Sequence, residues 1–483
     1  MNPLFRPAHY LARMVRKGDI GSLELLDLYL DRINQLNGLT RALCVIDAER
    51  ARKRARAADR ARSQGESWGP LHGLPITVKE SFDVAGLPTT WGVSEYQNNI
   101  ATGNAAAVDR LLAAGAIVMG KTNVPVLLAD WQSFNPLYGT TCNPWNHDRV
   151  PGGSSGGAAA ALATGFTSLE LGSDIGGSIR NPAHYCGIYG HKPTYGICSD
   201  EGHRLPRWIT GNDIAVIGPL ARSARDLELA LPLITGPDSR DGLAWRISLP
   251  RQSRKPWRDW RVAVLPDAET APVDSAIRNR VLEVADFARR QGATVSVAAR
   301  PDIDLAEAHE VFIHLLRAAT SRSLSDDGFA RNEERARTTP ASSTDYESWM
   351  LRGSTLSHRD WLACNERRQR MRERWAEFFR DWDVMLCPAA ATTAFPHDQK
   401  GERWERMITV DGKSQPSTTQ MFWAGYSGMA YLPSTVAPVG LAADGLPVGV
   451  QIIGPLYGDL TCIEFAGMLE RDLGGFSSPP DGR

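Results

Sequence analysis

Two glycine runs that each enclose a serine constrain this chain more than any other feature. The first covers residues 151–157, Pro-Gly-Gly-Ser-Ser-Gly-Gly, and contains Ser154; the second covers residues 172–180, Gly-Ser-Asp-Ile-Gly-Gly-Ser-Ile-Arg, and contains Ser178. Glycine permits positive φ angles and close backbone approach, at an entropic cost. Two such runs around small hydroxyl residues indicate that exposed N–H groups and hydroxyls matter at both places.

Local patterns give each run a structural setting. Residues 156–165 are rich in alanine and end in glycine, which predicts a short helix with Ser154 and its neighbour at the N-terminus. Residues 167–173 alternate and predict a strand, and residues 174–178 predict a tight turn after it. Successive N–H groups in such a turn can bind an anion. A serine hydroxyl beside them has the geometry of a nucleophile beside an oxyanion hole.

Two other interpretations of the glycine runs fit less well. A Gly-Ser segment is usually a flexible linker, but linkers do not alternate with helix and strand patterns. A phosphate-binding loop would need a Gly-Lys-Ser/Thr ending, which neither glycine run has, or an early Gly-x-Gly-x-x-Gly, which is absent.

A serine nucleophile needs a base. No histidine stands in a recognisable triad context. Lys79 follows an apolar strand pattern at residues 76–78. A lysine at a strand end is usually a solvated surface charge. The apolar surroundings favour burial instead, which would lower the pKa of this lysine by disfavouring the ammonium form.

Several longer motifs, in this order, resemble the amidase signature family of serine hydrolases. The resemblance covers nearly the whole chain and is tightest over residues 70–220 and 383–470. Its motifs are Gly-Leu-Pro-Ile-Thr-Val-Lys-Glu at 73–80, Gly-Lys-Thr-Asn at 120–123, Asn-Pro-Trp-Asn at 143–146, the two serine-containing runs, Gly-His-Lys-Pro-Thr-Tyr-Gly at 190–196 and Gly-Leu-Pro-Val-Gly-Val-Gln-Ile-Ile-Gly-Pro at 445–455.

The resemblance implies a role for individual residues. Ser178 matches the family's nucleophile, Ser154 the bridging serine on a cis peptide bond, and Lys79 the base. The implied oxyanion-hole donors are the N–H groups of Ile175, Gly176, Gly177 and Ser178, and the implied supporting residues are Ser155, Asp174 and Arg180.

The chain departs from the family pattern at two places near these motifs. Glu80 and Ser81 replace the commoner Asp-Asn after the lysine, and Val126 stands where many members carry glutamate. Neither change touches the implied triad, so we expect them to alter only its surroundings.

The implied fold class is α/β: the amidase signature fold, with a central mixed β-sheet covered by helices on both faces. We expect a single domain over residues 1–483. Its expected parts are an N-terminal helical segment at 1–65, a core with the signature motifs at 66–240, a variable, largely helical insertion at 241–382 and the C-terminal part of the core at 383–483.

Hydrophobic periodicity predicts further elements. Helices are expected at 22–37, with Ser22 as N-cap and Gly38 as stop, at 47–64, and at 358–380, where Trp361, Met371, Trp375 and Phe378 share a face. Strands are expected at 261–265, 383–387 and 448–453.

Composition argues against several partners and cofactors. The net charge is −1, and the basic residues between Arg50 and Arg62 are explained by a solvated helix face, so no nucleic-acid partner is expected. No apolar run of about 18 residues occurs, so no membrane partner is expected. Seven dispersed cysteines predict reduced thiols in the cytoplasm and no zinc site. We expect no metal and no cofactor, and a monomer or homodimer.

The substrate pocket is expected in variable loops over the carbonyl site. The candidate lining residues are Trp131, Phe134, Tyr138, Trp208 and Trp423. Residues 200–211, around Trp208, are a candidate lid. Aromatic lining favours hydrophobic or aryl amides, and the same site could cleave esters or carbamates.

Three function classes stay open at this point. The first is a stand-alone amidase acting on a small-molecule amide. The second is the glutaminase-like subunit of a tRNA-dependent amidotransferase, which would need partner subunits and a polar pocket. The third is a non-catalytic binding relative, which would be expected to lack a triad member, whereas all three are present.

Overall fold

A mixed sheet of eleven strands organises the computed structural model, which describes residues 3–206, 208–250 and 254–480. The sheet is parallel from β3 through β2 to β6 and from β11 through β9 to β10, and antiparallel elsewhere. In spatial order its strands are β1 (Leu43–Ile46), β3 (Ile117–Thr122), β2 (Pro75–Lys79), β6 (Leu169–Asp174), β8 (Val216–Ala221), β7 (Tyr189–Lys192), β14 (Ser434–Leu441), β15 (Pro447–Ile453), β11 (Val384–Pro388), β9 (Arg261–Val264) and β10 (Thr294–Ser296).

Helices and two small hairpins surround this sheet. The helices are α1 (Ala8–Lys17), α2 (Ser22–Thr40), α3 (Ala48–Ser63), α4 (Ala106–Ala113), α5 (Gly156–Thr164), α6 (Arg180–Cys186), α7 (Ala224–Ile234), α8 (Ser275–Arg290), α9 (Leu305–Thr320), α10 (Asp326–Thr338), α11 (Tyr346–Ser354), α12 (His358–Asp381), α13 (Met421–Gly428) and α14 (Asp459–Leu473). The hairpins pair β4 (Phe134–Asn135) with β5 (Gly139–Thr140) and β12 (Met407–Val410) with β13 (Lys413–Pro416).

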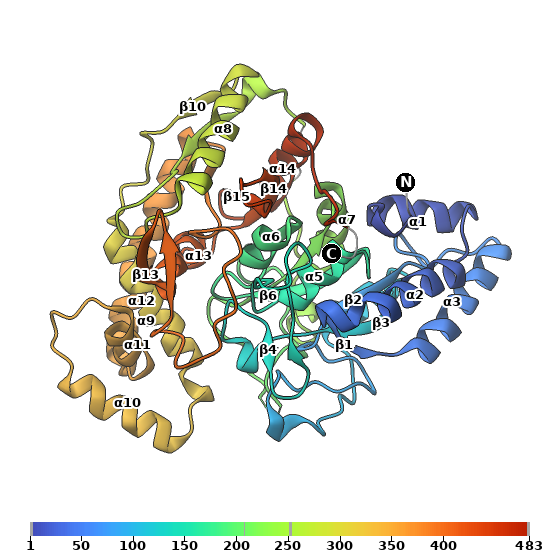
Figure 1. Ribbon diagram of the computed structural model, residues 1–483, viewed down its shortest axis with the longest axis horizontal. Helices are drawn as coiled ribbons and strands as arrows, with labels where there is room; N and C mark the ends of the chain where they lie inside the picture. Colours follow the sequence, from blue (N-terminus) through green and yellow to red (C-terminus); the bar gives the residue numbers. More distant parts are fainter. Residues whose placement is uncertain (1–2, 207, 251–253, 481–483) are drawn as a thin grey trace.

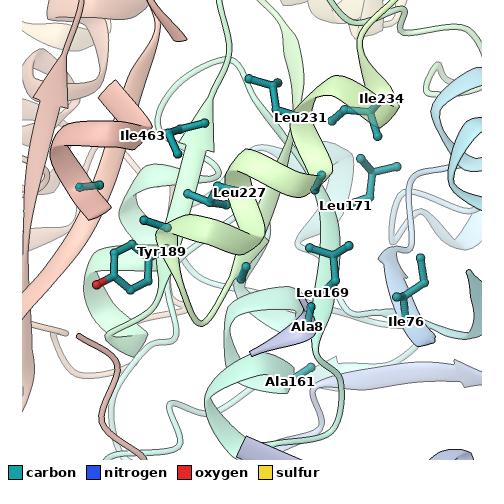
Figure 2. Packing of buried hydrophobic residues seen from close by; sticks show 14 of the residues in the cluster. Ala8, Ile76, Ala161, Leu169, Leu171, Tyr189, Leu227, Leu231, Ile234 and Ile463 are labelled. Carbon is teal, nitrogen blue, oxygen red and sulfur yellow. The ribbon is translucent and has the colours of Figure 1, made fainter. Parts of the chain in front are cut away.

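Helices pack on both faces of the sheet, as expected for this α/β class. On one face, Leu227 and Leu231 of α7 lie over Leu169 and Leu171 of β6 (Figure 2). On the other face, a Cβ at Gly172 of β6 would lie 3.1 Å from the Ser155 Oγ beside α5. Because successive strand residues point to opposite faces, β6 is buried on both sides.

All parts of the chain share this one sheet. Figure 1 draws α1 to α3 at one end of the molecule and α8 to α12 at the other. The segment 241–382 is mainly helical, and it also supplies β9 and β10 at one edge of the sheet. The boundaries between the four expected parts stay predictions.

Most of the predicted elements are confirmed. The helices at 47–64, 156–165 and 358–380 and the strands at 167–173, 261–265, 383–387 and 448–453 all occur within one to two residues of their expected ends. On α12, Met371, Trp375 and Phe378 are buried, while Trp361 is half-buried at the start of the helix.

The expected ends of α2 are wrong. Gly21 is the N-cap, Ser22 is the first helical residue, and the helix continues through Gly38 to Thr40. Its C-cap is Arg41, which takes a left-handed backbone conformation with φ +46°, and the Asn37 side chain exchanges two 3.0 Å hydrogen bonds with the backbone of Leu43 at the start of β1. Glycine inside a helix lowers its stability without ending it.

None of the helices within the described ranges combines the length and apolar character needed to cross a lipid bilayer.

Candidate active site

Lys79 is fully buried at the carboxyl end of β2, as the strand pattern predicted. Its Nζ lies 2.7 Å from Ser154 Oγ, so the structure brings the expected base and bridging serine together. The same Nζ lies 2.9 Å from Ser173 Oγ, on β6. Sequence reasoning did not single out Ser173, although it stands inside the second glycine run.

The environment of Lys79 suits a neutral amine. Burial lowers the pKa of Lys79 to about 7, against the opposing effect of the Asp174 and Glu170 carboxylates. A lysine with this pKa is substantially deprotonated at neutral pH, whereas a solvated lysine is not.

The first glycine run takes a backbone course that only small residues permit. The Gly153–Ser154 peptide bond is cis, as the resemblance implied. A Cβ on Gly153 would overlap the backbone of Asp130 and Gln132. The Gly153 N–H donates to Asn181 Oδ1 at 3.1 Å, which ties the run to α6.

Ser155 connects the two glycine runs. Its backbone N–H donates to the carbonyl oxygen of Ser178 at 3.1 Å, and its hydroxyl donates to the carbonyl oxygen of Ser173 at 3.4 Å. The bridging serine and the expected nucleophile are therefore held on neighbouring backbones.

In the turn after β6, three of the four expected N–H groups are free to bind an oxyanion. The Gly177 N–H donates at 2.9 Å to Asp174 Oδ1, so it already has a partner. Gly177 has φ +98°, which suits glycine. The N–H groups that donate to no atom of the described residues are those of Ile175, Gly176 and Ser178.

A buried ion pair braces the same turn. Arg180 Nε and Nη2 each donate at 2.9 Å to the Asp174 carboxylate. Burial by itself would raise the pKa of Asp174, but the Arg180 guanidinium holds it well below its usual value. Arg180 Nη1 also donates to Ala424 O at 2.8 Å and to Gln451 Oε1 at 2.8 Å, which anchors the turn to α13 and β15.

A cavity of about 850 Å³ opens above this turn. Ser154, Ser173 and Ser178 line it together with the turn residues Asp174, Ile175 and Gly176. Its aromatic wall residues are Trp91, Trp131, Trp208, Phe395 and Trp404.

Two of the five expected pocket residues line this cavity. Trp131 is one, and its Nε1 donates to the Gly176 carbonyl oxygen at 2.8 Å. Trp208 is the other, with its ring 3.9 Å from the Arg322 guanidinium carbon. The loop at 200–211 therefore reaches the cavity, although Arg207 within it lies outside the described residues.

The other three predicted pocket residues are not among the wall residues of this cavity. Trp423 is fully buried in the hydrophobic core, against Phe422. Phe134 belongs to strand β4 of the β4–β5 hairpin, and Tyr138 lies in the turn of this hairpin, where its N–H donates to Asn135 Oδ1 at 2.7 Å. Neither Phe134 nor Tyr138 is a wall residue of the cavity.

The wall residues that sequence reasoning missed carry weak sequence signals. Trp91 reaches the cavity from a loop held by Glu80, whose carboxylate accepts the N–H groups of Thr90 at 2.6 Å and Trp91 at 2.9 Å. In the sequence, only the departure from the family pattern at Glu80 could have indicated that this loop reaches the cavity. Phe395 and Trp404 come from long connections without a recognisable pattern. Val126, the second departure, is 39% exposed and is not a wall residue.

Metal-ligand geometry does not occur among the described residues: no three of their His, Cys, Asp and Glu side chains are grouped to hold an ion. All seven cysteines are described, and each is a free thiol. Cys186 is buried.

Comparison with known proteins agrees with this architecture. A family model described as Amidase matches residues 24–463. The chain is 32% identical over 474 residues to indoleacetamide hydrolase of Bradyrhizobium diazoefficiens, covering 96% of this chain and 86% of that protein. It is 33% identical over 505 residues to a glutamyl-tRNA(Gln) amidotransferase subunit of Anaeromyxobacter sp. (strain K), covering 96% and 95%. A solved bacterial aryl acylamidase of the amidase signature family matches with a TM-score of 0.82 at 25% identity, covering 97% of this chain and 96% of the other.

The fold, the two glycine runs and these matches across the chain place it in one class. The chain belongs to the amidase signature family. It is an amide-hydrolysing enzyme whose mixed sheet carries the serine-rich turn at the base of the cavity.

Proposed function

We propose that this enzyme hydrolyses amides through an acyl-enzyme on Ser178, with Ser154 and Lys79 relaying the proton. The 2.7 Å approach of Lys79 Nζ to Ser154 Oγ, inside a fully buried site, carries the proposal. Ser178 and Ser154 both border the cavity in which a substrate amide would lie.

In the first half-reaction, neutral Lys79 takes the proton of Ser154 Oγ, and Ser154 takes the proton of Ser178 Oγ. Ser178 Oγ then bonds to the amide carbon. The N–H groups of Ile175, Gly176 and Ser178 stabilise the tetrahedral oxyanion. Loss of one such donor costs about 3–4 kcal/mol in comparable enzymes.

Breakdown of this intermediate cleaves the C–N bond. Ser154 returns a proton to the leaving nitrogen as Lys79 gives its proton to Ser154. Water then attacks the acyl carbon, the relay accepts its proton, and Ser178 leaves with a proton, so the enzyme regains its starting state.

The proposed substrates are hydrophobic or aryl amides, with ester and carbamate cleavage as side activities. The aromatic wall residues support this choice, since pockets with such walls favour apolar groups. Similarity to an indoleacetamide hydrolase and to an aryl acylamidase supports it too. We keep a cytoplasmic location and a monomeric or homodimeric state as predictions.

Two measurements test the proposal. A fluorophosphonate should label Ser178, as mapped by mass spectrometry, and Ser178→Ala should abolish both labelling and hydrolysis. Ser168→Ala is the control, because Ser168 is also buried, stands just before the same strand and donates to the Pro75 carbonyl oxygen at 3.4 Å. Labelling at another serine by an active Ser178→Ala enzyme would refute the assignment.

A substrate panel tests the substrate class. It contains aryl acetamides, indole-3-acetamide, 4-nitroanilides, a 4-nitrophenyl ester, an aryl carbamate and glutamine. Faster hydrolysis of aryl amides than of glutamine is expected. A preference for glutamine would favour the amidotransferase-type function. This alternative is included because the chain is 33% identical to a glutamyl-tRNA(Gln) amidotransferase subunit.

A further inference from the structure

Arg317 brings a buried, uncompensated positive charge to the wall of the cavity. It lies near the end of α9, lines the cavity and is only 7% exposed. Its Nη2 donates to the Tyr346 hydroxyl, and its Nε is buried with no hydrogen-bond partner among the described residues.

The surroundings of Arg317 are positive rather than negative. Burial lowers the pKa of Arg317 to about 10, and the nearby Arg403 guanidinium contributes in the same direction. Among the described residues, the opposing effect on this pKa comes from the Tyr346 hydroxyl and not from a carboxylate. Three acids of the cavity wall are already paired: Asp130 with Arg406 at 2.6 Å, Asp174 with Arg180 at 2.9 Å, and Asp200 with Arg204 at 2.5 Å.

The position of Arg317 links it to the reaction centre. Its neighbour Leu316 packs against the serine-bearing turn, since Leu316 Cδ2 lies 3.8 Å from the position that a Cβ on Gly176 would occupy. Helices α9, α10 and α11 lie together in Figure 1, and residues of all three line the same cavity. One small molecule can therefore meet both the turn and this helix.

A buried charge without a partner is expensive, and a guanidinium binds a carboxylate through paired, charge-assisted hydrogen bonds. We propose that Arg317 binds a carboxylate of the substrate at a point away from the scissile amide. This inference rests on the proposed amidase function. It narrows the substrate class to aryl or hydrophobic amides that carry a carboxylate.

A purely structural role is the competing explanation. The Arg317 guanidinium carbon lies 5.4 Å from the centre of the Tyr346 ring, so the side chain could serve only to hold α9 against α11. The two roles differ in whether the charge on the substrate matters.

Two pairs of matched substrates separate these roles. On the acyl side, the mono-4-nitroanilide of glutaric acid is compared with that of glutaramic acid, its uncharged amide. On the amine side, 4-acetamidobenzoate is compared with 4-acetamidobenzamide. The enzymes are the wild type, Arg317→Gln, Arg317→Lys and Arg367→Gln. Arg367 is the control because it contacts α9 from outside the cavity, through Glu307 and Glu310.

The wild type should prefer the charged member of at least one pair. In Arg317→Gln, kcat/KM for that member should fall by about tenfold or more, through KM, while its uncharged partner changes by less than about twofold. Arg317→Lys should retain part of the preference and Arg367→Gln all of it. A wild type that favours the uncharged member of both pairs would overturn the proposal, and so would an unchanged preference in Arg317→Gln.

Binding to Ser178→Ala, measured by calorimetry with the same four compounds, separates this proposal from the proposed function. Weaker binding of the charged compound after adding Arg317→Gln or Arg317→Lys supports the carboxylate site whether or not hydrolysis occurs. Equal binding of charged and uncharged compounds refutes the site. If the wild type hydrolyses none of the four compounds, aryl amides are not its substrates. The binding measurements then decide whether Arg317 binds a carboxylate.

Discussion

Lys79 Nζ lies 2.9 Å from Ser173 Oγ, in addition to its 2.7 Å approach to Ser154 Oγ. The amine is thus held between one hydroxyl from each glycine run. This contact joins β2 to β6, neighbouring parallel strands whose carboxyl ends meet at the same edge of the sheet. The geometry orients the amine without any carboxylate hydrogen bond that would keep it charged.

The first prediction concerns pH. Burial lowers the pKa of Lys79 to about 7, and the proposed base must be neutral, so kcat/KM should rise as pH increases through about 7 and level off above it. Lys79→Ala should lose about three orders of magnitude in kcat, within the range for general-base catalysis. Lys79→Arg should not restore it, because arginine stays charged.

Initial rates on a 4-nitroanilide between pH 5 and 10 provide the measurement. The control is Lys413→Ala, an exposed lysine of β13. Near-wild-type hydrolysis by Lys79→Ala would contradict the proposed role.

The second prediction concerns Glu170, which burial leaves with a pKa raised to about 8. Its folded-state pKa lies above the unfolded value of about 4.3, so the stability it contributes is complete below that value and is lost as pH rises toward 8. Between these limits the wild type should lose about 1.4 kcal/mol per pH unit relative to Glu170→Gln. Activity at pH 7 should change little, since Glu170 is then mainly protonated.

Urea unfolding of both proteins at pH 5.5 and 8 checks this. A difference in unfolding free energy that does not change with pH would mean that Glu170 is ionised in the folded protein.

The third prediction concerns the Asp174–Arg180 pair. Both side chains are buried, and removal of one partner leaves the other as a buried charge without a counter-ion. Arg180→Gln should therefore lower the free energy of unfolding by about 3–5 kcal/mol. Arg337→Ala is the contrast, because its pair with Glu334 is exposed and is worth less than about 1 kcal/mol. Denaturant titrations measure both, and equal losses would argue against the bracing role.

The fourth prediction compares two glycines. A Cβ on Gly177 would lie 2.9 Å from Trp131 Cζ2 at a φ of +98°, so Gly177→Ala should displace the turn and reduce kcat. Gly38 lies inside α2 with open space around it, so Gly38→Ala should stabilise the protein by about 0.5–1 kcal/mol and leave kcat unchanged. Kinetics and thermal melting report the two effects, and an active, stable Gly177→Ala would exclude a tight turn.

The fifth prediction concerns the loop around Trp208. The Arg322 guanidinium stacks on the Trp208 ring, and Arg322 Nη2 donates to Thr210 O at 2.7 Å, so the loop is held over the cavity. If the loop acts as a lid, Trp208→Ala should raise KM for bulky aryl amides more than for acetamide. Equal factors for both substrates, or none, would leave Trp208 as a surface residue.

The sequence by itself determined the local elements around the site and which residues to consider. An alanine-rich segment closed by Gly165 forms α5, and an apolar strand ends at Lys79, because such patterns depend on backbone preferences and periodicity within a few residues. Motif order then identified the family. The approach of Lys79 to Ser154 was expected from the resemblance to this family; Lys79 ends a strand, whereas Ser154 stands just before helix α5.

Tertiary structure alone decided which side chains reach the cavity. Trp423 belongs to the core while Phe395 lines the cavity, although both are aromatic residues of the C-terminal part of the chain. Ser173 and Gly177 acquire their partners only when the turn closes. Arg317 and Ser178 line one cavity that is built from segments far apart in the chain. Local patterns cannot place such contacts, because burial and direction depend on how α9, α13 and the long connections pack against the sheet.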